Sequence, residues 1–304
     1  MNSKAKGIKS AIADFMLRHA IPGEMEQNLI KEAIHLHLLS ALSDAGALRH
    51  VIFQGGTALR LCYGGERYSE DLDFVCGKAG AYIDEIEFDR LVGDALETAK
   101  QSLNRDFDVD PNQIALRTPS NLLPMKCHAV SVTAWQIVVP IGPTARSPKS
   151  RIKIEFANVP SYDSGPNVAR VTPGLVQVQD VILTVESANE ILADKAVALT
   201  AREVLKYRDV WDIWYLIRIL NARADRNIVF RKFADYDTTN IAARARKRQS
   251  ELSKGSTAKS FLDEMRRFLP ARRVAEVSES GLSRTILDAS IELIDHAVSP
   301  ATSE

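Results

Sequence analysis

The spacing of apolar and polar residues divides the chain into helical ends and a mixed centre. At both ends apolar residues recur every three or four positions, which is the period of an amphipathic helix. In the centre, short apolar runs and strict alternation predict strands, most clearly at 151–156. There Ile152, Ile154 and Phe156 should face the core, and Glu155 should face the other way. The predicted helices are 4–19, 24–45, 84–103, 207–220, 241–247, 258–268 and 282–296; the predicted strands are 51–53, 71–75, 114–116, 127–139, 151–156 and part of 176–185.

The period becomes purely helical close to Glu186. Ser187-Ala188-Asn189-Glu190 fits a capping box, in which the serine oxygen and the glutamate carboxylate each accept a backbone N–H at a helix start. We therefore predict an α+β domain at 1–186, with N-terminal helices and a mixed or antiparallel sheet. An all-helical domain is expected at 187–304, and the polar stretch 158–174 should be a loop.

Composition limits the class of protein but does not indicate a reaction. The 304 residues are 45% hydrophobic and 26% charged, with a formal net charge of zero. A zero net charge predicts no global attraction to nucleic acid, so any RNA contact needs a local basic patch. The run Arg244-Ala245-Arg246-Lys247-Arg248 is either a solvated face or such a patch. No signal peptide and no apolar run of about 20 residues is found, and three scattered cysteines suit a reducing compartment, so we expect a cytoplasmic protein.

A glycine pair follows the apolar run 51–53 and carries the first candidate chemistry. Gly55 and Gly56 allow a tight turn and close approach of the backbone to a ligand. Thr57 then opens a predicted helix. Because the first N–H groups of a helix point at whatever lies before them and the helix dipole favours an anion, this turn predicts a phosphate site.

Two aspartates follow the turn at strand spacing. Asp71 and Asp73 lie two residues apart, so in a strand they share one face. Paired carboxylates repel each other unless a cation lies between them, and hard oxygen ligands favour Mg²⁺. Glu155 on a second alternating strand could add a third carboxylate. Asp-x-Asp alone is more often a solvated strand face, but beside a glycine turn it predicts a metal and nucleotide site.

These segments resemble the signature of the DNA polymerase β-like nucleotidyltransferase superfamily, and most closely that of the AbiEii/AbiGii (MenT-like) toxins. The resemblance rests on Gly55-Gly56-Thr57-Ala58-Leu59-Arg60 and Ser69-Glu70-Asp71-Leu72-Asp73-Phe74. It extends to Asp194–Arg202, which contains a lysine on a later helix, and to Tyr207–Asp212 on the next helix. The last motif reads Tyr-Arg-Asp instead of Lys-Asp and is followed by a second aspartate.

The resemblance implies roles for single residues. Lys195 would bind the triphosphate and Asp209 would position it or the nucleophile, while Asp212 competes with Asp209 for that role. Lys195 could instead be a snorkelling surface lysine, and either aspartate could form an ion pair with Arg208, Arg202 or Lys206 that only holds the fold together. Arg60 would most simply contact phosphate, although it could pair with Glu66 or Glu70. Ser69 would either cap the turn or bind a phosphate. The helical domain would thus contribute Lys195 and Asp209 to the cleft.

The expected function is a nucleotidyltransferase toxin of a bacterial toxin–antitoxin or phage-defence system. It would use Mg²⁺ or Mn²⁺ to move NMP from an NTP to an RNA, with the 3′ end of tRNA as the favoured acceptor, and so block translation. A cognate antitoxin is an expected partner, and no membrane is. A kinase or pyrophosphokinase on the same scaffold and a non-catalytic nucleotide- or RNA-binding module are the alternatives.

Overall fold

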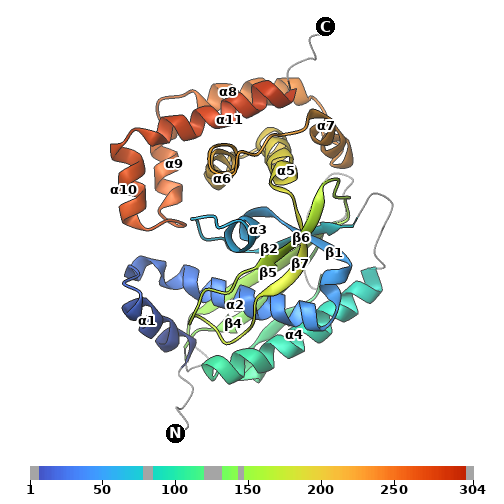
Figure 1. Ribbon diagram of the computed structural model, residues 1–304, viewed down its shortest axis with the longest axis vertical. Helices are drawn as coiled ribbons and strands as arrows, with labels where there is room; N and C mark the ends of the chain where they lie inside the picture. The colour runs from blue at the N-terminus through green and yellow to red at the C-terminus, as the bar shows by residue number, and fades with distance from the viewer. Residues whose placement is uncertain (1–6, 78–84, 120–131, 143–146, 299–304) are drawn as a thin grey trace. The chain divides into compact units, whose positions relative to one another are not determined.

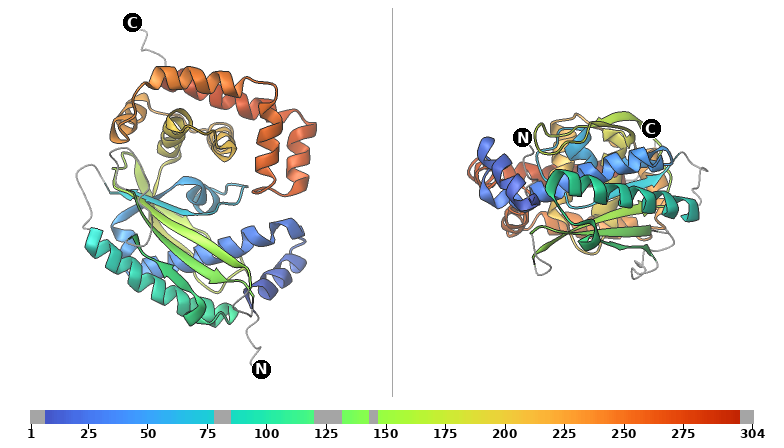
Figure 2. Two further views of the ribbon diagram at one scale, coloured as in Figure 1. Left: turned by 180° about the vertical axis from the view of Figure 1, so that it is seen from behind. Right: turned by 90° about the horizontal axis from the view of Figure 1, so that it is seen from below.

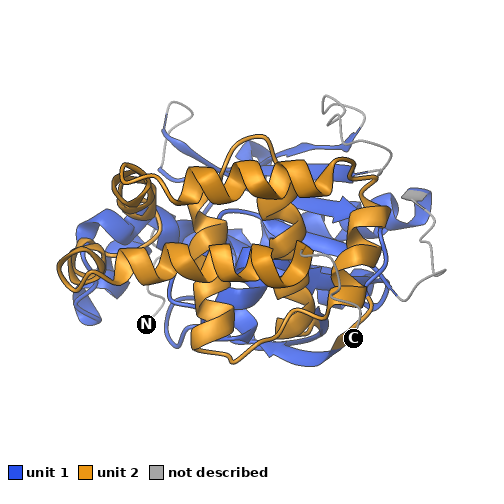
Figure 3. Cartoon of the chain, turned by 90° about the horizontal axis from the view of Figure 1, so that it is seen from above, with its two compact units in different colours: residues 1–127, 131–161, 165–185 blue, residues 128–130, 162–164, 186–304 orange. Residues whose placement is uncertain are grey.

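The computed structural model describes residues 7–77, 85–119, 132–142 and 147–298. It confirms an α+β fold with a seven-stranded mixed sheet and a helical C-terminal part (Figure 1). Lys4, Asp84, Cys127 and the first residues of the predicted strand 127–139 lie outside the described ranges. The chain forms two compact units, coloured in Figure 3: unit 1 is 1–127, 131–161 and 165–185, and unit 2 is 128–130, 162–164 and 186–304.

The first part of the chain, as far as β7, alternates helices and strands. The helices are α1 Ile8–Arg18, α2 Glu26–Asp44, α3 Gly55–Cys62 and α4 Glu85–Phe107. The strands are β1 Val51–Gln54, β2 Leu72–Cys76, β3 Ala115–Arg117, β4 Val132–Pro140, β5 Lys149–Ala157, β6 Ser164–Ala169 and β7 Val181–Glu186. They form one sheet in the order β3-β4-β5-β2-β1-β7-β6, in which β1 runs antiparallel to β2, and β2 runs parallel to β5.

One face of the sheet is buried under helices. The alternation predicted for β5 is confirmed, because Ile152, Ile154 and Phe156 are buried in the core. Helices α2 and α4 pack side by side, and α2 also packs against β5 (Figure 2). Phe88 of α4 contacts Phe156, with ring centroids 5.2 Å apart. Every second residue of the central strands therefore lies on the opposite face, where polar side chains can gather.

The prediction of an unbroken loop at 158–174 is wrong, because β6 crosses it. This strand has few apolar side chains and contains Pro166, which removes one backbone donor. It lies at the edge of the sheet, where a missing donor leaves no ladder hydrogen bond unmade. Apolar alternation could not reveal it, since an edge strand gains its order from a neighbour's backbone.

Seven helices are described in unit 2. They are α5 Ala188–Ala201, α6 Tyr207–Arg218, α7 Arg226–Asp235, α8 Ile241–Leu252, α9 Thr257–Met265, α10 Ala271–Glu279 and α11 Leu282–Val298. Helix α5 packs against α6, α7 and α8, while α11 packs against α6 and α8. Trp211, Trp214 and Tyr215 are buried, as expected for core residues. None of the helices in the described ranges combines the length and apolar character needed to cross a membrane.

Two of these helices, α7 and α10, were missing from the sequence prediction. Helix α7 has a visible start signal, since the Asp225 carboxylate accepts hydrogen bonds from the N–H groups of Asn227 and Ile228. Helix α10 buries only Val274 and Val277. Short helices with two or three buried residues carry little periodic signal, and packing against neighbours supplies most of their stability.

Candidate active site

Gly55 and Gly56 are the first two residues of a helix. The sequence had predicted a turn at these glycines, with the helix beginning at Thr57. Helix α3 begins at Gly55, whose φ of +76° is unfavourable for residues with a side chain. A Cβ on Gly55 would lie 2.7 Å from Asp73 Oδ2. A Cβ on Gly56 would lie 2.9 Å from Ser69 Oγ and would collide with the guanidinium of Arg67. The two glycines therefore leave room for a carboxylate, a hydroxyl and a guanidinium around the N-terminus of α3.

The candidate metal ligands come from neighbouring strands. Asp73 on β2 is in register with Gln54 on β1 and with Glu155 on β5. Asp71 directly precedes β2, and its Oδ1 accepts a hydrogen bond of 3.2 Å from the backbone N–H of Lys153. The structure thus brings Asp73 and Glu155 to adjacent positions of the sheet and ties Asp71 to the same strand, β5.

The pKa of the Asp71 carboxyl reflects its burial and its charged neighbours. Burial raises the pKa of its carboxyl, the Lys153 N–H bond opposes that rise, and the charges of Glu155 and Glu70 add to it. A carboxyl whose charged form is disfavoured in this way is stabilised by a cation. Carboxylate oxygens suit a hard divalent ion, and Asp71 and Asp73 are the pair that would hold it. Within the described residues, their oxygens and those of Glu155 do not all lie within 4.8 Å of one another. Glu155 lies near them but also pairs with Lys153 Nζ at 3.4 Å.

Replacing Asp71 by asparagine should raise the melting temperature at neutral pH. A pKa raised by folding means that the native state binds more protons than the unfolded state, so stability falls as pH rises through the shifted pKa. Asparagine removes the charge and keeps an acceptor for the Lys153 N–H. Thermal denaturation between pH 4 and 8 should show a gain that shrinks toward pH 4, with the exposed residue Asp44 changed to asparagine as the control. An Asp71→Asn protein less stable than wild type at pH 8 contradicts this account.

Two residues predicted to lie at the phosphates, Thr57 and Arg60, have partners within the fold. The Thr57 hydroxyl is buried and donates to the backbone carbonyl of Asp71. Arg60 Nε donates to a carboxylate oxygen of Glu32 at 2.7 Å, and the guanidinium lies 4.2 Å from the ring centroid of Tyr68. Glu32 was not among the partners suggested for Arg60, and Arg60 Nη1 also donates to the backbone carbonyl of Glu66 at 3.2 Å. The other suggested carboxylate, that of Glu70, pairs with Lys31 at 2.8 Å.

The lysine and aspartates of unit 2 form their own buried cluster. Lys195 Nζ lies 2.6 Å from Asp209 Oδ1 and 2.7 Å from Asp212 Oδ2. Arg202 also pairs with Asp209. Burial would raise the pKa of Asp209, but Lys195 and Arg202 outweigh it and hold that pKa well below its usual range. The two candidate aspartates therefore share one lysine, so the structure does not single out either of them.

A second buried cluster was not anticipated. Glu186, Glu190 and Asp194 form the group of carboxylates in the described part of the chain whose oxygens all lie within 4.8 Å of one another. Lys232 Nζ occupies its centre, at 3.2 Å from Glu186 and 2.8 Å from each of the other two. Burial disfavours the charged lysine, but the acidic neighbours prevail and raise its pKa. An ammonium thus fills the position a metal would take.

This cluster also corrects the capping box. Ser187 Oγ accepts the N–H of Glu190 at 3.1 Å, as the sequence predicted. The Glu190 carboxylate, however, accepts the N–H groups of Tyr162 and Asp163 and pairs with Lys232, while the N–H of Ser187 donates to the Asp163 carbonyl. A distant lysine, invisible in local spacing, redirects the glutamate.

The basic run 244–248 is partly buried in the fold. Arg244 Nη1 donates to the carbonyl of Ala201 at 2.8 Å. Arg248 is buried, and its guanidinium donates to the carbonyls of Leu199 and Arg202 at 2.7 and 2.6 Å. These carbonyls belong to the last turn of α5 and its C-cap, where helix acceptors have no partner of their own. Arg246 and Lys247 are the exposed cations of the run.

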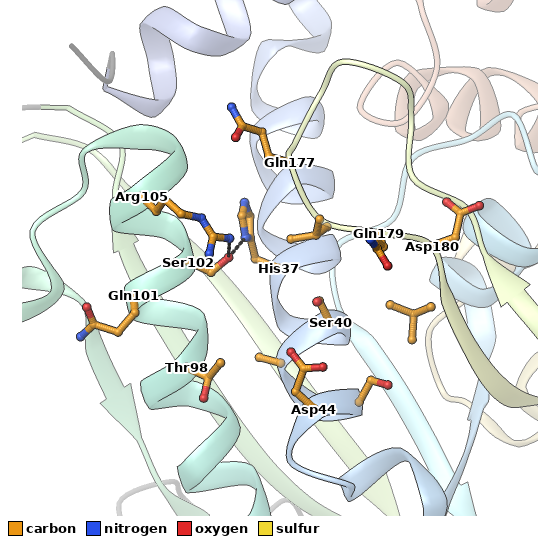
Figure 4. A pocket seen from close by; sticks show the side chains of 14 residues that line it. His37, Ser40, Asp44, Thr98, Gln101, Ser102, Arg105, Gln177, Gln179 and Asp180 are labelled. Atoms are coloured by element: carbon orange, nitrogen blue, oxygen red, sulfur yellow. Dashed lines mark hydrogen bonds between the residues drawn. The ribbon is translucent and has the colours of Figure 1, made fainter. Parts of the chain in front are cut away.

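A cavity of about 720 Å³ lies away from these carboxylates, between α2, α4 and residues 177–181 (Figure 4). At its wall His37 Nδ1 lies 2.6 Å from Ser102 Oγ. Asp71, Asp73 and Glu155 do not line it. This cavity therefore contains none of the predicted site residues, and it gives no reason to move the candidate site.

Comparison with known proteins decides which family this geometry belongs to. The family model "Nucleotidyl transferase AbiEii toxin, Type IV TA system" matches residues 37–280, most of the chain. This chain is a member of the AbiEii nucleotidyl transferase toxin family. The matched range contains the α3 glycines, Asp71, Asp73, Glu155 and the Lys195 cluster. Membership in the AbiEii family makes the protein a toxin of the nucleotidyltransferase class.

Two solved structures are similar to this chain at low sequence identity. JHP933 from Helicobacter pylori is 17% identical, with 89% of this chain and 94% of that chain covered and a TM-score of 0.46. A proposed nucleotidyltransferase from H. pylori is 18% identical, with 89% and 97% covered and a TM-score of 0.41. No curated protein sequence matches the chain.

Proposed function

We propose that this AbiEii-family protein transfers NMP from an NTP to the 3′ end of an RNA, with tRNA as the favoured acceptor, and so blocks translation in the cytoplasm. The acceptor hydroxyl attacks the α-phosphorus, the bond to the β-phosphate oxygen breaks, and pyrophosphate and a proton leave. The main support is one juxtaposition: Asp73 Oδ2 lies against Gly55 at the start of α3 and in register with Glu155. A carboxylate thus lies beside a helix N-terminus, and helix N-termini favour anions.

Each part of the site has a proposed task. Asp71 and Asp73, with Glu155 beside them, would hold Mg²⁺ or Mn²⁺, whose charge stabilises the transferring phosphoryl group. Gly55, Gly56 and Ser69 would bind the triphosphate through N–H and O–H donors. Thr57 would support them by fixing the Asp71 backbone. A cognate antitoxin and a role in phage defence follow as proposals from the toxin family.

Labelled nucleotides test the reaction directly. Purified protein is incubated with total RNA, Mg²⁺ and each NTP in turn, labelled at the α- or the γ-phosphate. Label from the α-phosphate should appear in RNA of tRNA size and should disappear when the metal is chelated. Transfer of the γ-label would instead favour a kinase, and binding without turnover would favour a non-catalytic module. Either result overturns the proposal.

Lys195 is proposed as a phosphate-binding cation whose position is fixed by Asp209 and Asp212. Lys195→Met should lower transfer about 100-fold, as expected for loss of one charge that stabilises phosphate. The same change leaves two buried carboxylates without their lysine and should also lower stability. The triple variant Lys195→Met, Asp209→Asn, Asp212→Asn removes those charges and should recover the melting temperature. Recovery of transfer as well would show that the lysine serves the fold alone.

A further inference from the structure

One side of strands β3, β4 and β5 carries an excess of positive charge. Along β5 the side chains that alternate with the buried ones, and so face away from the helix-covered core, are Lys149, Arg151, Lys153 and Glu155. Arg117 of β3 shares this side, because it is in register with Gln136 and Gln136 is in register with Lys153. Four cations against one carboxylate leave a formal charge of +3 on this side of the three strands. We call these four cations the basic face.

Most of the basic face is open to solvent and has no partner in the fold. Lys149, Arg151 and Arg117 are exposed, and within the described ranges none of the three forms an ion pair or a side-chain hydrogen bond. The side chain of Lys153 is 44% exposed and lies 3.4 Å from Glu155. The basic run 244–248 differs, because two of its arginines donate to helix carbonyls. The basic face is therefore a local positive patch in a chain whose formal net charge is zero.

The basic face leads along β5 to the candidate metal ligands. A strand rises about 3.3 Å per residue, so the three cations of β5 extend over about 13 Å. The next residue on the same side is Glu155, which is in register with Asp73. Asp71 accepts the backbone N–H of Lys153 and so lies at the same end of the row. A polyanion bound along β5 would therefore bring one of its ends to these carboxylates.

Charge and chemistry favour single-stranded RNA as the occupant of this row. A single strand presents one phosphate per nucleotide, and a row of cations can neutralise successive phosphates. An acidic protein segment would feel the same attraction, but it brings no hydroxyl for nucleotidyl transfer. The 3′ end of an RNA does bring that hydroxyl, and the proposed reaction needs it beside Asp71 and Asp73.

We infer that the basic face binds the phosphates of the RNA acceptor strand and directs its 3′ end toward Asp71 and Asp73. This assignment rests on the proposed nucleotidyl transfer and adds the surface that holds the acceptor. Lys153 contacts a phosphate near the 3′ end, and Lys149 contacts one further from it. Arg117, on the far side of β4, widens the track across the sheet.

Binding of RNA to the full-length chain tests the inference without turnover. The probe is a fluorescent single-stranded RNA of about 12 nucleotides, followed by anisotropy at several salt concentrations. The double variant Arg117→Gln, Arg151→Gln should bind about 10-fold more weakly, as expected for two exposed charge contacts. The slope of log affinity against log salt should become shallower by about 1.4, because each phosphate contact contributes about 0.7. The melting temperature should stay that of wild type, since both side chains are exposed.

Two matched variants separate local contact from net charge. The double variant Arg18→Gln, Arg49→Gln removes two exposed arginines of unit 1 that are not part of the basic face. It changes the net charge equally and should bind RNA as wild type does. The double variant Arg117→Lys, Arg151→Lys keeps both charges and should keep the salt slope. In transfer assays Arg117→Gln, Arg151→Gln should raise the KM for RNA and leave the KM for NTP unchanged.

The outcomes distinguish this inference from the function on which it rests. Unchanged RNA affinity and salt slope in Arg117→Gln, Arg151→Gln overturn it, and so does an equal loss in Arg18→Gln, Arg49→Gln. Normal RNA binding combined with lost binding of the cognate antitoxin would mark the basic face as a protein interface and overturn it too. If RNA affinity depends on the basic face but no α-label reaches RNA, the inference holds and the proposed reaction fails.

Discussion

Lys232→Met should lower the free energy of unfolding by about 3–5 kcal/mol, because it leaves buried carboxylates without their counter-charge. The lysine is 1% exposed and lies within 3.2 Å of Glu186, Glu190 and Asp194. Burial and the charge of Asp194 raise the pKa of Glu186, so the charged form of this carboxyl is disfavoured even in the native cluster. Urea unfolding followed by tryptophan fluorescence measures the loss, since Trp211 and Trp214 lie in the same unit.

The exposed residue Lys247 offers a matched control, and Lys247→Met should change stability by less than about 0.5 kcal/mol. Lys232→Ala adds a sharper test. It leaves three carboxylates with oxygens within 4.8 Å of one another and an empty centre. Calcium should then raise the melting temperature of Lys232→Ala by more than it raises that of wild type. A Lys232→Met protein as stable as wild type would show that the cluster contributes nothing.

Asp73→Asn should reduce nucleotidyl transfer about 1000-fold while the protein stays folded. Losing a ligand of the proposed metal removes several kcal/mol of charge stabilisation, and each 1.36 kcal/mol is a factor of ten in rate. Asparagine has nearly the shape of aspartate, so the space beside Gly55 stays filled. The measurement is pyrophosphate release with saturating NTP and RNA.

Asp94→Asn on the exposed side of α4 serves as the comparison, because it removes one exposed carboxylate that is not a predicted ligand. Its transfer rate should equal that of wild type. Full activity of Asp73→Asn would remove Asp73 from the metal site, whereas equal losses in both variants would point to an effect of charge on folding or solubility.

The order of elements and the buried face of the sheet were predictable from periodicity. Ile152, Ile154 and Phe156 alternate with charged residues, and burial follows that alternation because apolar surface must leave water. Strand β6 and helix α10 were not predictable in this way, because they bury few side chains and depend on neighbours. Apolar periodicity predicts only those segments that bury a row of their own side chains.

The shared strand position of the candidate ligands was also visible in the sequence, since Asp71 and Asp73 have strand spacing, and in the structure Asp73 lies in register with Glu155. The partners of the cationic side chains Arg60 and Lys232 could not be predicted from the sequence. Arg60 pairs with Glu32, which lies 28 residues earlier. Lys232 redirects Glu190 from its expected cap across more than 40 residues. Long-range ion pairs of this kind depend on how helices pack, which neither spacing nor composition encodes.

The two arginines that cap the C-terminus of α5, Arg244 and Arg248, affect how strongly RNA affinity should depend on salt concentration. Polyanion binding is driven by the counterions that exposed cations release, and each phosphate neutralised on a single strand steepens the salt dependence by a slope of about 0.7. Arg244 and Arg248 donate to helix carbonyls, so the exposed cations of their segment are Arg246 and Lys247. The contribution of residues 244–248 to the salt dependence of RNA affinity should therefore be that of two cations, although the run contains four.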